Sequence, residues 1–159
     1  DMSGMEEKER TVAKHAIQNA LDQKYPKKTT KVKILSDKTV VDAVHRHPFV
    51  NYDVPVLAEL VAIGEDLKAD RVIYLSLEPT KSEEDGFRII VGTQTFASEV
   101  SMKMKCVDVK NKAYLFNQLV VKEGSSSAVS FWKFGGASKS RSVKKAVTSC
   151  MEEFLINIE

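Results

Sequence analysis

The chain has 159 residues, of which 43% are hydrophobic and 29% charged. This is enough apolar sequence for one domain with its own core, and too much for a disordered chain. Lysine and arginine total 24 against 22 aspartate and glutamate residues, so the charge balance gives no reason to expect a nucleic-acid-binding face. No apolar run approaches the roughly 20 residues of a membrane span, and no signal-peptide pattern is present.

The first predicted element is an amphipathic helix from about residue 6 to residue 25, where Pro26 ends it. Its apolar residues recur at helical spacing: Val12, Ala13, Ala16, Ile17, Ala20 and Leu21. A short strand is then predicted for residues 31–34 and a short helix for residues 36–44. A third helix follows a cap at Asp53, and Gly64 within it indicates close packing or an early end.

Residues 72–77 are almost continuously apolar, which predicts a central strand covered on both faces. An irregular strand is predicted over residues 86–96. Apolar residues then alternate along residues 100–106 and again along 113–122, with a polar turn at 108–112, a pattern typical of a β-hairpin. Lysines cluster around this hairpin and are expected to keep one sheet face soluble: Lys103, Lys105, Lys110 and Lys112.

Residues 124–127 are predicted to be a flexible loop, and residues 138–158 a closing amphipathic helix. The order of elements predicts a single domain over residues 1–159, of the α/β class in its mixed α+β form. We expect a mixed β-sheet with an antiparallel meander, packed by amphipathic N-terminal, middle and C-terminal helices. The connection through the third helix is expected to be a right-handed crossover.

Two stretches carry a family resemblance. The pair Ile63-Gly64 is followed by Leu67 and then by the residues KADRVI at 68–73, and the meander contains VDVK at 107–110. The chain from about residue 6 to residue 158 resembles the α/β domain of bacterial envelope lipoproteins related to the curli-secretion channel subunit. It is also similar to penicillin-binding-protein activator lipoproteins and to the N-terminal domain of the translocation protein TolB.

Members of this family usually open with an apolar strand before the first helix, and residues 1–5 contain none. Residues 1–4 do resemble the turn after such a strand. The resemblance therefore implies either a first strand upstream of residue 1 or a sheet that is one strand short. In the second case the exposed sheet edge is expected to invite a partner strand.

A glycine- and serine-rich segment before the last helix is a candidate anion site. Backbone N–H groups at a helix start, hydroxyls and two cations are the groups that hold a phosphate or carboxylate. The alternative is a flexible linker whose serine caps the helix, because the full P-loop pattern is absent. The candidate residues are Gly135, Gly136, Ser138, Lys139 and Arg141.

Phe131, Trp132 and Phe134 form an aromatic segment that is either an exposed interaction patch or a cover for the sheet edge or the end of the last helix. Cys106 and Cys150 lie on apolar stripes and are either buried thiols or a disulfide. His45 and His47 lie two residues apart, so on a helix they point about 200° apart and suit a polar helix end better than a metal site. No catalytic, cofactor or metal site is predicted.

The expected function is that of a non-enzymatic accessory or assembly module acting through protein contacts. The resemblance implies an extracytoplasmic location in a bacterial envelope, with a lipid anchor upstream as one arrangement. The expected partner is another envelope protein or a second copy of the chain, and not a nucleic acid. The alternative is a small-ligand or anion-binding domain that uses the segment from Gly135 to Ser142.

Overall fold

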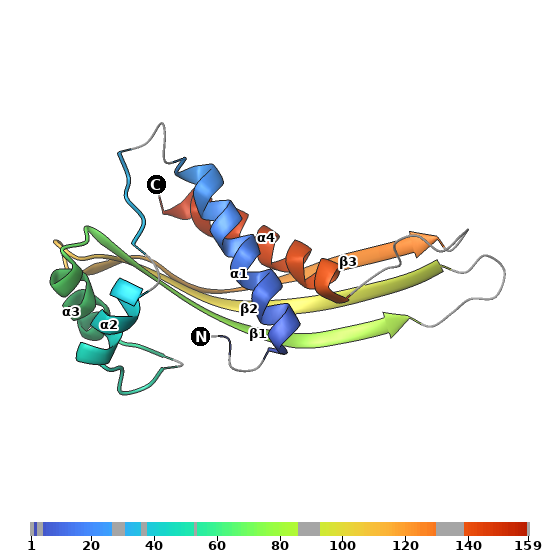
Figure 1. Cartoon of the computed structure of the whole chain (residues 1–159), viewed down its shortest axis with the longest axis horizontal. Helices are drawn as coiled ribbons and strands as arrows, with labels where there is room; N and C mark the ends of the chain where they lie inside the picture. Colours follow the sequence, from blue (N-terminus) through green and yellow to red (C-terminus); the bar gives the residue numbers. More distant parts are fainter. Residues whose placement is uncertain are drawn as a thin grey trace.

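The computed structural model describes residues 2, 5–26, 31–35, 38–52, 54–85, 93–129 and 139–158. Its elements, in chain order, are α1 (Glu7–Lys24), α2 (Lys38–Arg46), α3 (Leu57–Leu67), β1 (Arg71–Asp85), β2 (Thr93–Asp108), β3 (Ala113–Val129) and α4 (Lys139–Asn157). The three long strands form an antiparallel meander in the order β1-β2-β3. Helices α1 and α4 lie together on one side of it, and α2 and α3 gather at one end (Figure 1). The predicted mixed α+β class and the hairpin are confirmed.

The main core lies between the sheet and α4. Alternation along β2 directs Val100, Met102, Met104 and Cys106 to one face, and all four side chains are fully buried. The apolar stripe of α4 closes this face and is itself buried: Val143, Ala146, Val147, Cys150, Met151, Phe154 and Leu155. Helix α1 adds a second layer of small residues, Ala13 and Ala16. The helix periodicity read from the sequence therefore corresponds to the core.

Two glycines mark places where a neighbouring element comes very close to the backbone. A Cβ on Gly124 of β3 would lie 1.9 Å from the Ser142 carbonyl oxygen of α4 and 2.6 Å from the Ala146 nitrogen. A Cβ on Gly64 of α3 would lie 2.3 Å from a methyl carbon of Val109. At Gly124 the obstructing atoms belong to the helix backbone, so only a residue without a side chain fits there, whereas at Gly64 they are methyl groups of Val109 and Val72. The close packing inferred at Gly64 is therefore confirmed.

Several details differ from the sequence prediction. Residues 31–35 adopt no regular structure, so the expected short strand is absent there, and among the described residues no strand precedes α3 to form a crossover. Residues 72–77 lie in β1, an edge strand of the described sheet, because they pair only with β2. Residues 124–127 continue β3 rather than forming a loop, since Gly124 lets the strand pass directly beneath α4. Of the irregular strand expected at 86–96, residues 93–96 belong to β2, and 86–92 lie outside the described residues.

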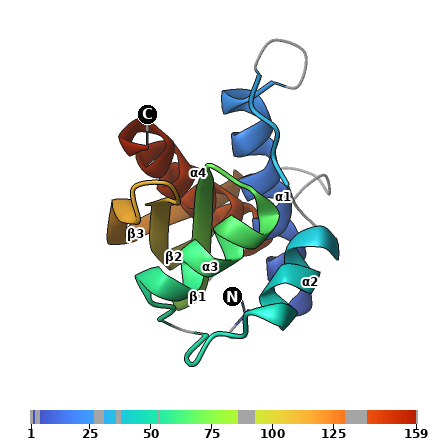
Figure 2. The same ribbon diagram turned by 90° about the vertical axis from the view of Figure 1, so that its left-hand side faces the viewer.

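The opposite face of the sheet is covered only in part by the described chain. At the end that carries the β2–β3 turn, α3 packs on it through a small second core of Leu60, Val61, Tyr74 and Val107. Figure 2 shows α3 in front of the strands at this end, with α2 beside it. Farther along the same face, Leu119 and Val121 of β3 are exposed. Among the described residues, no helix is long and apolar enough to cross a membrane.

Candidate functional site

The loop between α2 and α3 exposes apolar side chains. Residues 49–52 and 54–56, called here the anchored loop, carry Val50, Tyr52, Val54 and Val56, with exposed fractions of 97%, 52%, 50% and 56%. Isolated exposed apolar residues are ordinary, but a cluster of them on one segment marks an interaction site. This loop is therefore the strongest candidate surface among the described residues.

The carboxylate of Glu59 fixes both ends of the loop. One oxygen accepts the Val50 N–H at 2.8 Å, and the other accepts the Val56 N–H at 2.8 Å. The second contact also caps the first turn of α3, where backbone donors lack helical partners. These two backbone donors lower the pKa of Glu59 below its ordinary value. The carboxylate is therefore held in the charged form that the loop requires.

The sheet holds the middle of the loop. The Lys105 ammonium donates to the Pro55 carbonyl oxygen at 2.7 Å, and the Tyr74 hydroxyl donates to the Tyr52 carbonyl oxygen. Phe49 contacts the rings of both Tyr52 and Tyr74 edge-on, with centroids 5.4 and 6.1 Å apart. Side chains from β1, β2 and α3 thus fix the loop backbone and bury Pro55, while the side chains of Val50, Tyr52, Val54 and Val56 remain exposed.

Lys105 has a role that the sequence pattern did not reveal. It was expected to keep a sheet face soluble, but it is only 8% exposed and lies 5.8 Å from the centre of the Tyr114 ring. Burial lowers its pKa, and the nearby Glu59 carboxylate opposes that shift. The alternation of polar and apolar residues along this strand predicted a solvent-exposed face. That prediction was wrong for Lys105 because the loop that covers it lies 50 positions earlier in the chain.

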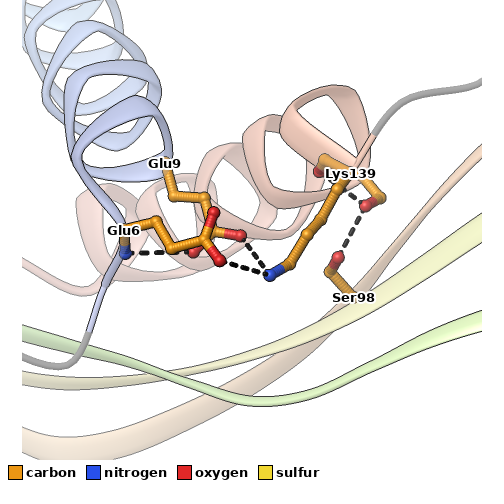
Figure 3. Close-up of polar contacts among 5 residues, drawn as sticks. Glu6, Glu9, Ser98 and Lys139 are labelled. Carbon is orange, nitrogen blue, oxygen red and sulfur yellow. Dashed lines mark hydrogen bonds and ion pairs between the residues drawn. The ribbon is translucent and has the colours of Figure 1, made fainter.

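A polar cluster joins the N-terminal ends of α1 and α4 (Figure 3). The Lys139 ammonium lies 2.7 Å from a carboxylate oxygen of Glu9 and 3.8 Å from one of Glu6. The Glu9 side chain is only 4% exposed, so the pair neutralises an almost buried charge. The hydrogen bond to Glu9 raises the pKa of Lys139, which therefore stays protonated and cannot serve as a general base.

The candidate anion site is only partly described. Gly135, Gly136 and Ser138 lie outside the described residues, as do the aromatic candidates Phe131, Trp132 and Phe134. Lys139 is engaged by Glu9, whereas Arg141 lines a different surface, a groove between α4 and β3. The two cations of the candidate site therefore have separate surroundings.

Other reactive groups are engaged or buried. The Ser98 and Ser142 hydroxyls lie 2.6 Å apart inside the protein, and Ser142 also donates to the Lys139 carbonyl oxygen. Cys106 and Cys150 are unbonded thiols in the main core, so the candidate disulfide is not formed in this structure. Burial raises the pKa of both thiols, that of Cys150 to about 11. At neutral pH both are therefore protonated and poor nucleophiles.

The segment that contains the histidines forms a polar surface at the C-terminal end of α2. The Arg46 guanidinium lies 2.7 Å from an Asp66 oxygen, and His47 Nε2 lies 3.3 Å from the same oxygen. Asp66 belongs to α3, so these contacts tie the two short helices together. No group of three potential metal ligands gathers among the described residues.

No protein-family model matches the chain, and no curated protein matches it. Among solved structures, the chain is similar to a hypothetical protein of Chlamydia trachomatis, with 12% sequence identity and a TM-score of 0.44. The likeness covers 93% of this chain and 81% of the other. At that level it supports no statement about function.

Proposed function

We propose that the chain is a non-enzymatic accessory module of a bacterial envelope, located outside the cytoplasm, and that it acts through protein contacts made by the anchored loop. The observation that carries this proposal is the contrast within the loop between a fixed backbone and exposed apolar side chains. The family resemblance on residues 63–73 and 107–110 supports the compartment.

The hydrogen bonds to the loop make it suited to binding. Ordering a flexible loop on association costs free energy, and a loop that is already fixed avoids that cost. Glu59, Tyr74 and Lys105 together make four hydrogen bonds to its backbone. The exposed Val50 and Tyr52 side chains can then enter a partner's apolar pocket with little loss of conformational entropy.

A binding role agrees with the state of the reactive groups. Lys139 stays charged beside Glu9, Ser142 is buried, and the pKa of each cysteine thiol is raised. None of these described groups combines a reactive form with access to a substrate. This supports contact rather than chemistry as the activity of the described chain.

Site-specific photo-crosslinking tests the proposal. A benzoyl-phenylalanine residue would replace Val50 in the loop and, as a matched control, the exposed Lys14 of α1. Cells that express the protein would be irradiated and the adducts identified by mass spectrometry. We expect one dominant protein adduct from position 50, lost when Tyr52→Ser and Val54→Ser are added, and none of that mass from position 14.

Two outcomes would contradict the proposal. Equal labelling from positions 14 and 50 would mean that the loop has no preferred partner. Binding to phospholipid vesicles that disappears in the Tyr52→Ser, Val54→Ser variant would mean that the loop meets a membrane surface instead of a protein. Size-exclusion chromatography with light scattering distinguishes a second copy of the chain from a different partner, and either result supports a protein contact.

A further inference from the structure

A groove follows the outer edge of β3 beneath α4. It has a volume of about 690 Å³ and lies between the strand segment at residues 123–126 and the outward face of the helix. Arg141, Lys144 and Lys145 line it on the helix side, and among its described lining residues Glu123 alone is acidic. The groove is therefore strongly basic, although the whole chain has a formal charge of only +2.

The basic residues form one stripe of α4. Arg141, Lys145 and Thr148 are separated by four and three positions, so they share a helix face. Arg141 and Lys145 lie about 6 Å apart along the helix axis, at 1.5 Å per residue. Alternate residues of an extended strand are about 6.7 Å apart and point to the same side. A strand lying in the groove would thus present every second side chain to successive cations.

The edge of β3 is able to accept such a strand. In the described sheet β3 pairs with β2 alone, and its register runs without interruption from Phe116 to Val129. It contains no proline between its ends, so each of its residues carries a backbone N–H as well as a carbonyl oxygen. The register of β3 also shifts once, between Tyr114 and Phe116, but this lies outside the groove segment. The other edge differs in sequence, since β1 contains Pro79 and its register shifts beside that proline, between Pro79 and Lys81. Proline and a bulge are common ways of protecting an edge.

Close packing at Gly124 places the β3 edge beside the basic stripe of α4. Because Gly124 has no side chain, the β3 backbone lies directly against the Ser142 and Ala146 backbone of α4. A fourth strand would lie about 4.8 Å beyond β3 and hence beneath the outward stripe. Exposed Lys144 and Lys145 have no ion pair with a described carboxylate. They can therefore meet a partner's acidic groups without breaking an existing pair.

We propose that this edge, the strand segment 123–126 with the basic stripe of α4, takes up an extended acidic segment of a partner protein as a fourth strand. Main-chain hydrogen bonds to β3 supply the affinity, and acidic residues at alternate positions supply the specificity. This surface is separate from the anchored loop. It rests on the proposed function only in that the partner is a protein.

Peptide binding measured by fluorescence polarisation tests the inference. The probe is a labelled ten-residue peptide with glutamate at alternate positions and threonine or valine between them. One control peptide has the same composition with contiguous glutamates, and a second keeps the alternating sequence but is N-methylated at every second residue. We expect the alternating peptide to bind at least tenfold more tightly than either control, with an affinity that falls as salt rises.

Matched protein variants locate the site. Lys144→Glu with Lys145→Glu is expected to weaken binding at least tenfold. Lys8→Glu with Lys14→Glu on α1 makes the same change of charge at exposed positions and is expected to leave binding within twofold. Circular dichroism checks that each variant is folded, and the milder Lys144→Ala, Lys145→Ala pair replaces the charge reversal if it is not.

The results separate this inference from the function proposed above. Tyr52→Ser with Val54→Ser should leave peptide binding unchanged, so the loop and the edge can fail independently. Equal binding of the contiguous or N-methylated peptide would overturn strand addition, because charge alone would then account for it. Competition by inorganic phosphate or by a single-stranded oligonucleotide, with no preference for the alternating peptide, would overturn it in favour of a general anion surface.

Discussion

On the α4 side of the sheet, Met102, Met104 and Phe154 are completely buried and contact other apolar side chains. On the opposite side, where the anchored loop lies, Val50 is almost fully exposed while the loop backbone is held by Glu59 and Lys105. The first region gains its stability from burial of apolar surface, and the second gains its order from hydrogen bonds to main-chain groups. The difference separates a region that holds the fold from one that can present a surface.

The largest expected effect is on the α4 side. Gly124→Ala places a methyl group against the α4 backbone, which cannot move without disturbing the core. We expect it to lower the free energy of unfolding by about 3 kcal/mol, at the upper end of the cost of overpacking. Urea denaturation followed by circular dichroism measures this. Ser125→Ala, at the next and exposed position, is the control and should change little.

A smaller loss is expected where α1 meets α4. Lys139→Ala leaves the Glu9 carboxylate, only 4% exposed, without its partner. The expected cost is about 2 kcal/mol, because an unsatisfied buried acceptor costs more than a surface ion pair gains. The measurement is again urea denaturation, with Lys8→Ala on the exposed face of α1 as control.

Removing the charge of Glu9 gives a further check on the Lys139–Glu9 pair. In a Glu9→Gln background, Lys139→Ala should cost clearly less than it does alone, since no charge is then left unpaired. Equal costs in the two backgrounds would show that Lys139 stabilises the protein through something other than Glu9.

The smallest effect on global stability is expected at the loop, where the response is local. The Val50 and Val56 amides lower the pKa of Glu59 below its ordinary value of 4.5. A carboxyl group with a depressed pKa in the folded state contributes stability above its unfolded pKa and loses it as pH falls through the folded value. Below that value the loop should therefore lose both anchors.

NMR spectroscopy of the amide groups measures this titration. The resonances of Val50 and Val56 should shift together as pH falls through a midpoint below 4.5, while resonances of the α4 core stay in place. Glu59→Gln should abolish the shared titration. Independent midpoints for the two amides would mean that one carboxylate does not hold both ends of the loop.

The sequence was sufficient to predict the positions of the elements that bury an apolar stripe. The helix at 7–24, the helix ending at 157 and the hairpin around residues 109–112 appear close to their predicted positions, because periodicity and turn chemistry are local signals. Strand 72–77 was correctly identified as a strand, but its place in the sheet was not. A continuous apolar run does not distinguish a central strand from an edge strand that is covered by helices.

The candidate surfaces show the same division between what the sequence predicts and what only the fold reveals. The segment of residues 49–56 carries no recognisable binding motif, and its importance appears only when Glu59, Tyr74 and Lys105 are seen to hold its backbone. Likewise, Arg141 was noted in the sequence as part of an anion loop with Lys139. The fold instead groups it with Lys144 and Lys145 beside β3.

The sequence by itself determined the helices, the hairpin, the apolar core and the mixed α+β class, since each depends on the spacing of residues near one another in the chain. Only the tertiary structure decided that Lys105 is buried, that β3 continues through Gly124 beneath α4, and that the loop before α3 exposes its apolar side chains. The reason is physical: burial and pairing depend on what covers a residue, and the covering groups come from 18 to 50 positions away.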